Sequence, residues 1–263
     1  MKKWRKKMQR QAETIGKRWD YCADGYDAIV QNEFAEELAE KWSEILKNHA
    51  PCEKGKVLDI GTGPGFFAVL MGRMGWQVTG IDCSEKMVET AARNAGKAGV
   101  HAEFYQMDNH QLDFPEDTFD YIICRNVTWI LYDPEKAFAE WKRVLKPGGR
   151  ILYFDANWHM TGNAEYREDI KRDEEEYRKL YGDPENTYTG DENTDQEFQK
   201  VLYFNEILRP NWDEIHLPTL GYENMEIVPR VNEQVYSEKK QLLYRSIPMF
   251  LVCADKPAER MQA

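Results

Sequence analysis

Three alternating glycines lie in the stretch VLDIGTGPGFFAVL, residues 57–70, and they are the strongest chemical signal in this chain. Asp59 comes two residues before Gly61, and Gly63 and Gly65 follow between two apolar runs. Glycine lets a backbone turn sharply and approach a ligand without a Cβ clash. A helix that begins at such a turn points its positive N-terminus at the ligand. The stretch therefore predicts a nucleotide-type cofactor at a strand-to-helix turn.

The spacing of the glycines distinguishes two kinds of cofactor site. A dinucleotide fingerprint reads GxGxxG/A, with a small residue at the sixth place for close packing of helix on strand. Here the spacing is GxGxG, and the sixth place holds Phe66, whose ring would obstruct that packing. A nicotinamide-dependent oxidoreductase therefore stays an alternative against which Phe66 argues.

Strand-like and helix-like segments alternate around this turn at short spacing. Buried-strand patterns are KVLDIG, QVTGID, HAEFYQMD, FDYIICRN and RILYFDAN, and YENMEIVPRV and SIPMFLVCADK follow near the end of the chain. Helix patterns lie between them, one with Ser84 placed to cap it and one with Pro134 in its first turn. KPGG, before the fifth strand, reads as a turn. This order predicts an α/β fold: a Rossmann-like, seven-stranded, mostly parallel sheet with helices on both faces.

Two helical regions frame the predicted sheet, one before it and one inserted after the fifth strand. Apolar residues at Trp4, Met8, Ile15 and Trp19 predict a docked N-terminal helix with a basic outer face, and a second helix is expected from about Glu33 to Lys47. We expect an N-terminal helical cap, a cofactor-binding core, an acidic helical insertion or lid, and C-terminal strands that complete the sheet. Their bounds are 1–50, 51–157, 158–220 and 221–263.

Charge and composition exclude several classes of protein. The net charge of -11 argues against a nucleic-acid binder, which needs a basic face for phosphates. No run approaches the ~18 apolar residues of a membrane span, and no secretory signal follows the basic first ten residues. The five cysteines are scattered without a CxxC pair, so neither a metal site nor a disulfide framework is expected. A cytoplasmic setting is the default, and the oligomeric state is open.

The motifs around the glycine turn resemble those of a family, the class I S-adenosylmethionine (SAM) dependent methyltransferases. VLDIGTGPGFFA looks like their first motif, VTGIDCSEKM like the second, FYQMDNHQLDF like the third and FDYIICRN like the fourth. EWKRVLKPGGRILYFD resembles the helix, turn and fifth strand that follow. The resemblance covers roughly residues 55–157 in the family's order, and it implies SAM as cofactor and S-adenosylhomocysteine as product.

The resemblance implies a role for each residue at the carboxyl ends of the strands. Asp59 would organise the glycine turn and meet the methionine amino group, and Asp82 would accept hydrogen bonds from both ribose hydroxyls. Asp108 would bind the adenine amino group, although Asp113 competes with it for that role. The implied cofactor residues are Asp59, Gly61, Thr62, Gly63, Gly65, Asp82, Cys83, Met87, Asp108, Asn109, Arg125 and Asn126.

The methyl acceptor is less defined than the cofactor. RWDYCADGYDAIV resembles the N-terminal segment of small-molecule methyltransferases related to those of quinone biosynthesis, so Tyr26 either faces the methyl group or only packs on the helix. The segments expected to bind the acceptor supply Tyr21, Tyr26, Trp129, Tyr132 and Trp158. One hypothesis is that these aromatic residues, with Asp155 and the Glu174–Glu176 run, hold a cationic or amine acceptor; the other reading is that the acids form a solvated face.

The predicted function is SAM-dependent transfer of a methyl group to a small molecule by in-line displacement. Positioning supplies most of such catalysis, so a general base is optional. Weak candidates for a base are His110, Tyr26 and His159, with a surface-loop position favoured for His110. A non-catalytic SAM-binding protein is a further alternative. An RNA or protein methyltransferase is disfavoured by the acidic charge and by CRNV in place of a DPPY- or NPPY-type motif. The accepting atom, O, N, S or C, stays open.

Overall fold

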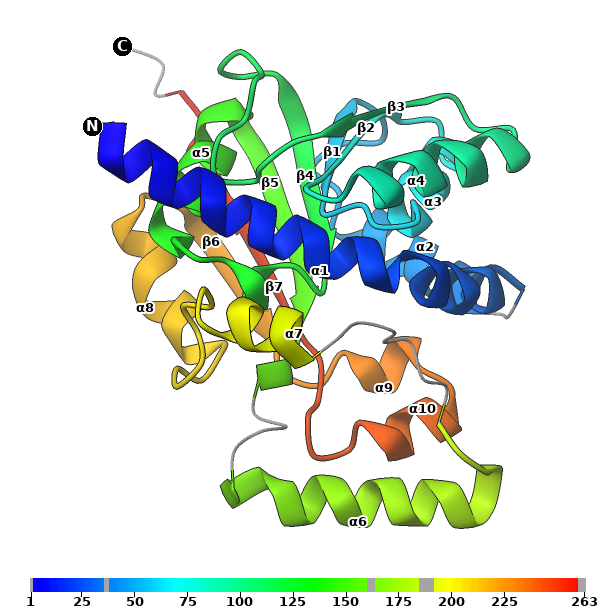
Figure 1. Ribbon diagram of the computed structural model, residues 1–263. Coiled ribbons are helices and arrows are strands. Elements are labelled where there is room, and N and C mark those ends of the chain that lie inside the picture. Colours follow the sequence, from blue (N-terminus) through cyan, green and yellow to red (C-terminus); the bar gives the residue numbers. More distant parts are fainter. Residues whose placement is uncertain (1, 36–37, 160–163, 185–191, 260–263) are drawn as a thin grey trace.

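The computed structural model describes residues 2–35, 38–159, 164–184 and 192–259. Its centre is one seven-stranded sheet with the order β3-β2-β1-β4-β5-β7-β6 (Figure 1). β7 runs antiparallel to both of its neighbours, and the other pairings are parallel. The expected seven-stranded, mostly parallel sheet is confirmed. The strands are β1 (Lys56–Ile60), β2 (Gln77–Asp82), β3 (Ala102–Gln106), β4 (Phe119–Arg125), β5 (Leu145–Asp155), β6 (Glu223–Val228) and β7 (Phe250–Asp255).

Helices cover both faces of the sheet, because neighbouring residues of a strand point to opposite faces. Val57 of β1 packs in the cluster under α2, α3 and α9, whereas Leu58 packs in the cluster under α5 and α8. The described helices are α1 (Lys2–Ala35), α2 (Leu38–Asn48), α3 (Phe66–Arg73), α4 (Glu85–Lys97), the 3₁₀ turn η1 (Thr128–Ile130), α5 (Pro134–Val144), α6 (Ala164–Tyr181), α7 (Glu192–Gln199), α8 (Asn211–Thr219), α9 (Asn232–Val235) and α10 (Glu238–Leu243).

The N-terminal helix is longer than the sequence pattern predicts. α1 extends to Ala35, so Glu33 belongs to it and the expected start of the second helix there is wrong. The helix continues because Cys22, Ala23 and Tyr26 carry on its apolar face and pack with Met87 of α4. Its docking on the domain is confirmed for the described side chains. The side chain of Trp4 lies outside them.

The KPGG segment is not a turn before the fifth strand. β5 runs through it, and the pairing with β4 shifts from Phe119 opposite Leu145 to Tyr121 opposite Arg150. The residues between form a bulge, in which Gly148 takes the left-handed conformation. The two helical expectations nearby are confirmed: Ser84 caps α4 by accepting from the Met87 amide, and Pro134 lies in the first turn of α5.

The acidic insertion is helical in its described part, and its helices pack in different places. α6 packs on α10 at one end of the molecule, α7 packs on α1, and α8 covers the sheet beside β6 (Figure 1). The segment between β6 and β7 is helical too, as α9 and α10. Among the described residues, no helix combines the length and apolarity that crossing a bilayer requires.

Gly16 allows α1 to cross the end of β2 at close range, and this contact can be tested. A Cβ at Gly16 would lie 2.7 Å from the carbonyl oxygen of Cys83, whereas a Cβ at Gly96 of α4 would meet nothing within 4 Å. We expect Gly96→Ala to stabilise the fold by about 0.5–1 kcal/mol, because alanine favours the helix. Gly16→Ala should destabilise it by about 1–3 kcal/mol, because backbone must move.

Guanidinium unfolding measures both variants, and hydrogen exchange across α1 shows whether the loss is confined to that helix. Equal stability of the two variants, with unchanged exchange in α1, would contradict the close crossing of α1 over Cys83.

Candidate cofactor and acceptor sites

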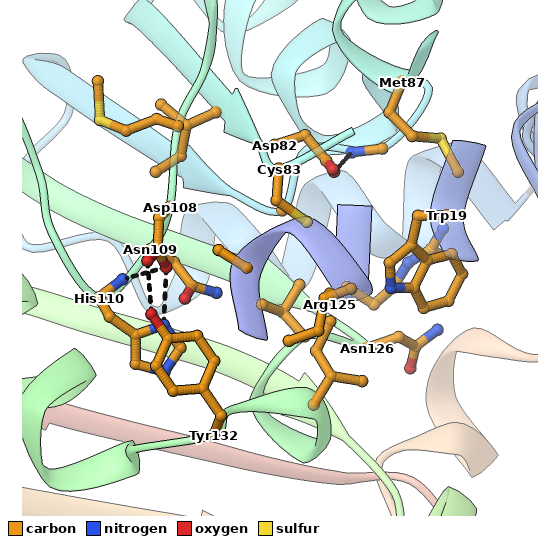
Figure 2. A pocket seen from close by; sticks show the side chains of 18 of the residues that line it. Trp19, Asp82, Cys83, Met87, Asp108, Asn109, His110, Arg125, Asn126 and Tyr132 are labelled. Carbon is orange, nitrogen blue, oxygen red and sulfur yellow. Dashed lines mark hydrogen bonds and ion pairs between the residues drawn. The ribbon is translucent and has the colours of Figure 1, made fainter. Parts of the chain in front are cut away.

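A cavity lies at the carboxyl ends of β1, β2 and β4, where open α/β sheets bind ligands. Its empty volume, which includes space open to solvent, is about 650 Å³. Side chains from α1 line one side of it, and Trp19 is labelled among them in Figure 2. We call it the cofactor pocket. The predicted residues that line it are Tyr26, Gly61, Gly63, Asp82, Cys83, Met87, Asp108, Asn109, His110, Arg125, Asn126 and Tyr132.

The glycine turn is organised by the carboxylate of Asp59. Its Oδ2 accepts from the Thr62 hydroxyl at 2.6 Å and from the Ala68 amide at 3.0 Å. Burial raises the pKa of Asp59 to about 7. Asp59, Thr62 and Gly65 do not line the pocket, because they support the turn from behind. A Cβ at Gly65 would lie 3.1 Å from the backbone of Ala91, so this glycine serves the packing of the turn on α4.

Asp82 is anchored by two backbone amides and still faces the pocket. Oδ2 accepts from Gly63 at 3.0 Å and Oδ1 from Ser84 at 2.9 Å (Figure 2). A carboxylate has about four acceptor sites, so one remains on each oxygen for a vicinal diol. Burial raises the pKa of Asp82 to about 6. The start of α4 is also tied to α1, because the Ser84 hydroxyl donates to Asp20 at 2.6 Å.

Asp108 lines the pocket, whereas its competitor Asp113 is exposed and does not. Asp108 accepts from the amide and from Nδ1 of His110, and from the Tyr132 hydroxyl at 2.5 Å (Figure 2). Burial opposes ionisation of Asp108, but these hydrogen bonds outweigh it and lower its pKa. The backbone of Asn109 is fixed as well, since its carbonyl accepts from the Trp141 indole at 2.9 Å.

His110 is not a surface-loop residue, and that expectation is wrong. Its side chain is 1% exposed and stacks on Tyr132 with ring centroids 3.6 Å apart. Nδ1 faces Asp108, and Nε2 accepts from the amide of Asp133 at 3.3 Å. Both ring nitrogens are thus engaged in shaping the pocket wall, which favours a positioning role over that of a base. Sequence reasoning missed this because the fold brings Tyr132 and Asp133 over the loop.

A second pocket adjoins the first and has an empty volume of about 1650 Å³. Four residues line both pockets: Trp19, Tyr26, Arg125 and Asn126. The second half of α1 and the end of β4 therefore form the wall between the two pockets. Trp129 and Trp158, predicted for the acceptor, line only the second pocket, and so do Tyr177 of α6 and residues of α10 and its flanking segments. We call it the acceptor pocket. Tyr132 faces the cofactor pocket instead.

Besides the three residues behind the glycine turn, the predicted residues Tyr21 and His159 also face neither pocket. Tyr21 is 48% exposed, because it lies two residues after Trp19 and so about 200° around the helix, whereas Tyr26 returns to the same face. His159 has both ring nitrogens buried without a hydrogen-bond partner among the described residues. Burial, with the charge of Arg209, lowers its pKa to about 4. The position of Tyr21 therefore does not suit binding of the acceptor, and that of His159 does not suit a general base.

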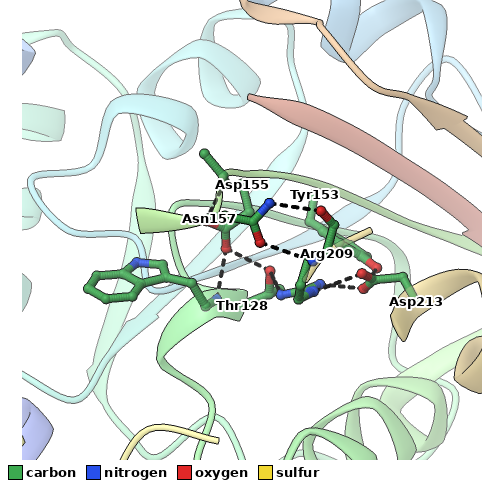
Figure 3. A network of polar contacts seen from close by, with 8 residues as sticks. Thr128, Tyr153, Asp155, Asn157, Arg209 and Asp213 are labelled. Atoms are coloured by element: carbon green, nitrogen blue, oxygen red, sulfur yellow. Dashed lines mark hydrogen bonds and ion pairs between the residues drawn. The ribbon is translucent and has the colours of Figure 1, made fainter. Parts of the chain in front are cut away.

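The acids that the sequence offered for a cationic acceptor also lie away from both pockets. Asp155 is fully buried and accepts from Thr128, from the Trp129 amide and from the Ala156 amide (Figure 3). Burial raises its pKa to about 6. Glu174–Glu176 lie on α6, where each is paired with a basic side chain. These acids support the structure or meet solvent.

The network around Asp155 fixes the loop after β4 that carries Trp129. Arg209 donates to the Thr128 hydroxyl at 2.7 Å and to the carboxylate of Asp213, which also accepts from Tyr153 (Figure 3). Asn157 exchanges two hydrogen bonds with the Arg209 backbone. Because these buried groups are mutually satisfied, the loop between the two pockets is held rigidly.

Sequence reasoning missed the part of each pocket that comes from distant helices. Ala12, Ile15 and Trp19 of α1 cover the cofactor pocket. Tyr177, Tyr236 and Tyr244 contribute to the acceptor pocket. The apolar face of α1 was visible in the sequence, but nothing local says that it faces a ligand rather than core.

Comparison with known proteins agrees with this geometry. Residues 58–153 match the family described as methyltransferase domain. The chain is 40% identical over 113 residues to the uncharacterized methyltransferase YcgJ of Bacillus subtilis, covering 42% of this chain and 45% of that one. It is 33% identical over 106 residues to a phosphatidylethanolamine N-methyltransferase of Cereibacter sphaeroides, covering 40% and 52%. It is 31% identical over 115 residues to a ubiquinone biosynthesis O-methyltransferase of Yersinia pestis, covering 43% and 47%.

Among solved structures, the fold is similar to that of a protein from Methanococcus maripaludis described as a candidate SAM-dependent methyltransferase. The TM-score is 0.59 at 22% identity, over 91% of this chain and 94% of that one. Residues 58–153, which contain most of the sequence motifs, thus match a methyltransferase domain, and the chain shares its fold with that solved structure. The chain spans about half the length of the curated relatives it matches.

The pKa of Asp82 predicts a pH dependence of cofactor affinity. An ionised carboxylate accepts both ribose hydroxyls, whereas a protonated one loses part of that capacity. With a pKa of about 6, Asp82 is ionised at pH 7 and protonated at pH 5. Affinity for S-adenosylhomocysteine should therefore be full above pH 7 and fall about tenfold by pH 5.

Calorimetric titration of wild type and Asp82→Asn at both pH values measures this effect. Asp59 titrates in the same window, so the difference between the two proteins isolates Asp82. If the affinity fell equally with pH in wild type and in Asp82→Asn, the pH dependence would come from a group other than Asp82.

Proposed function

We propose that this protein transfers a methyl group from SAM to a small-molecule acceptor bound in the acceptor pocket. The observation that carries the proposal is the shared wall of the two pockets: Trp19, Tyr26, Arg125 and Asn126 face both. A donor in one pocket and an acceptor in the other would meet at these four side chains. Methyl transfer requires that meeting, because it is an in-line displacement between two bound molecules.

The donor groups of the cofactor pocket fit SAM. Asp82 has acceptor capacity for a diol, and a Cβ at Gly63 would project into open space, as a backbone that approaches a ligand requires. Asn126 has its Oδ1 buried without a partner among the described residues, so it can accept a hydrogen bond from the amino group of the methionine moiety. SAM would supply there a methyl group activated by the sulfonium.

The residues at the shared wall position the reactants and do not move protons. The Tyr26 hydroxyl accepts from Asn126 at 3.2 Å, and burial raises its pKa, so it stays protonated. Trp19 meets Tyr26 edge-on with ring centroids 5.6 Å apart and helps α1 to exclude water. Positioning and water exclusion supply the rate enhancement in this proposal.

The small-molecule acceptor is supported by the shape and charge of the protein. The acceptor pocket is enclosed by helices, and the net charge of -11 disfavours nucleic acid. The names of two relatives point to different accepting atoms, nitrogen in one and oxygen in the other. Because the chain spans about half of their length, the accepting atom must be argued from this chain's own residues. A cytoplasmic location stays a prediction.

The cofactor can be tested by thermal shift with SAM, S-adenosylhomocysteine, NAD and NADP. A ligand at 100 times its Kd adds about 2.7 kcal/mol, or about 5 to 10 °C for a chain of this size. We expect that shift with the two adenosyl compounds only. Asp82→Ala should abolish it, whereas Asp113→Ala, exposed and outside the pocket, should retain it.

A shift with NAD or NADP alone would replace the methyltransferase by the oxidoreductase alternative. Adenosyl binding without methyl transfer to any compound of a broad acceptor screen would favour the non-catalytic alternative.

A further inference from the structure

The acceptor pocket is cationic, although the protein as a whole is acidic. Among the residues that the structure describes, its lining holds three cations, Arg125, Lys239 and Lys240, against one carboxylate, Glu33. The chain carries 46 acidic and 35 basic side chains, so chance would place more acids than bases here. A cleft of one sign inside a protein of the other sign concentrates ligands of opposite charge.

The one carboxylate is already neutralised and is not available to a ligand. Oε2 of Glu33 pairs with Arg125 and Oε1 with Lys240, both at 2.7 Å, and the Glu33 side chain is 5% exposed. Burial opposes its ionisation, but the two cations outweigh that and lower its pKa. A cationic acceptor would find no free carboxylate in this lining.

Two lysines of α10 place positive charge in the lining of the acceptor pocket. Lys240 is part of the ion cluster but partly exposed, with its ammonium 4.9 Å from the Tyr236 ring. Lys239 is exposed, lines the pocket, and has no hydrogen bond or ion pair among the described residues. An ammonium in this position can meet an anionic group of a ligand.

Aromatic rings supply the rest of the wall. Trp158 meets Tyr244 edge-on with ring centroids 5.3 Å apart. Trp129 lines the acceptor pocket next to Asn126 of the shared wall. Trp129 is held there because its indole donates to the Asn126 carbonyl at 3.1 Å. Rigid rings of this kind favour a flat ligand through stacked and edge-on contacts.

We propose that the acceptor is a phenol whose aromatic ring carries a carboxylate, with the carboxylate toward Lys239 and Lys240 and the hydroxyl toward Tyr26 and Asn126. This inference rests on the proposed function. The phenol gives its proton to bulk water as it binds, because the guanidinium of Arg125, which lines the shared wall, lowers the pKa of the phenol. A lone pair of the phenolate oxygen forms the new O–C bond, while the C–S bond breaks and its electron pair stays on sulfur. The products are an aryl methyl ether and S-adenosylhomocysteine.

Three matched compounds test the acceptor class: 3,4-dihydroxybenzoate, 3,4-dihydroxybenzamide and 3,4-dihydroxybenzylamine. They share a catechol ring and differ in the charge of one substituent. Calorimetry of the full chain, with and without S-adenosylhomocysteine, should rank benzoate first, amide about tenfold weaker and amine weakest. Tritiated SAM should label the benzoate fastest. Equal affinities, a preference for the amine, or no binding of the benzoate would overturn the proposal.

Lysine variants locate the charge effect. Lys239→Gln should weaken the benzoate about three- to tenfold and leave the amide unchanged. Lys179→Gln on α6 makes the same charge change outside the pocket and should alter neither. Equal losses in both variants would reduce the effect to overall charge and overturn the assignment to Lys239.

The same calorimeter separates this inference from the proposed function. If S-adenosylhomocysteine binds but the benzoate has no preference, the acceptor class is wrong and the methyltransferase stands. If S-adenosylhomocysteine does not bind, the proposed function fails, and the assignment of the acceptor fails with it.

Discussion

The carboxylate of Glu33 holds together the parts of the chain that form the reaction site. It is buried on α1 and binds Arg125 at the end of β4 and Lys240 on α10, so one side chain joins three distant segments. Removing one partner of a buried ion cluster leaves an uncompensated charge, which typically costs about 3–5 kcal/mol. The rings of Trp42, Phe66 and Phe67 surround the Arg125 guanidinium at 4.7–5.4 Å and exclude water from it. The cluster therefore sets where α1 and α10 lie on the sheet.

Most of the sheet could be predicted because its signals are local. Apolar runs bounded by glycines, the Ser84 cap and Pro134 each report on a few neighbouring residues, and the structure confirms those elements. The sequence predictions were wrong where tertiary packing overrides local signals. α1 continues through Gly25 because its apolar face packs on α4. β5 continues through KPGG because β4 pairs with it on both sides of the bulge, and β7 pairs with it from Arg150 onward.

The cofactor pocket could be anticipated more fully than the acceptor pocket for the same reason. Gly61, Gly63 and Asp82 sit at strand ends, so their place follows from the strand pattern. The burial of His110 depends on Tyr132 folding over it, which no spacing reveals. The acidic run on α6 is prominent in sequence but faces its own basic partners. The two lysines of α10 are inconspicuous in sequence, and the fold turns them toward the site.

The recognisable part of the sequence and the part that selects the acceptor are different parts of the chain. The matched domain, residues 58–153, contains the glycine turn and the ends of β2 and β4. In the acceptor pocket it contributes Arg125, Asn126 and Trp129, while the other lining residues come from α1, α2, α6, Trp158, and α10 with the residues directly before and after it. Identity within 58–153 therefore carries information on the cofactor and little on the acceptor. This explains how relatives of similar identity can bear names with different accepting atoms, and why the charge of this chain's own pocket is the better guide to the proposed acceptor.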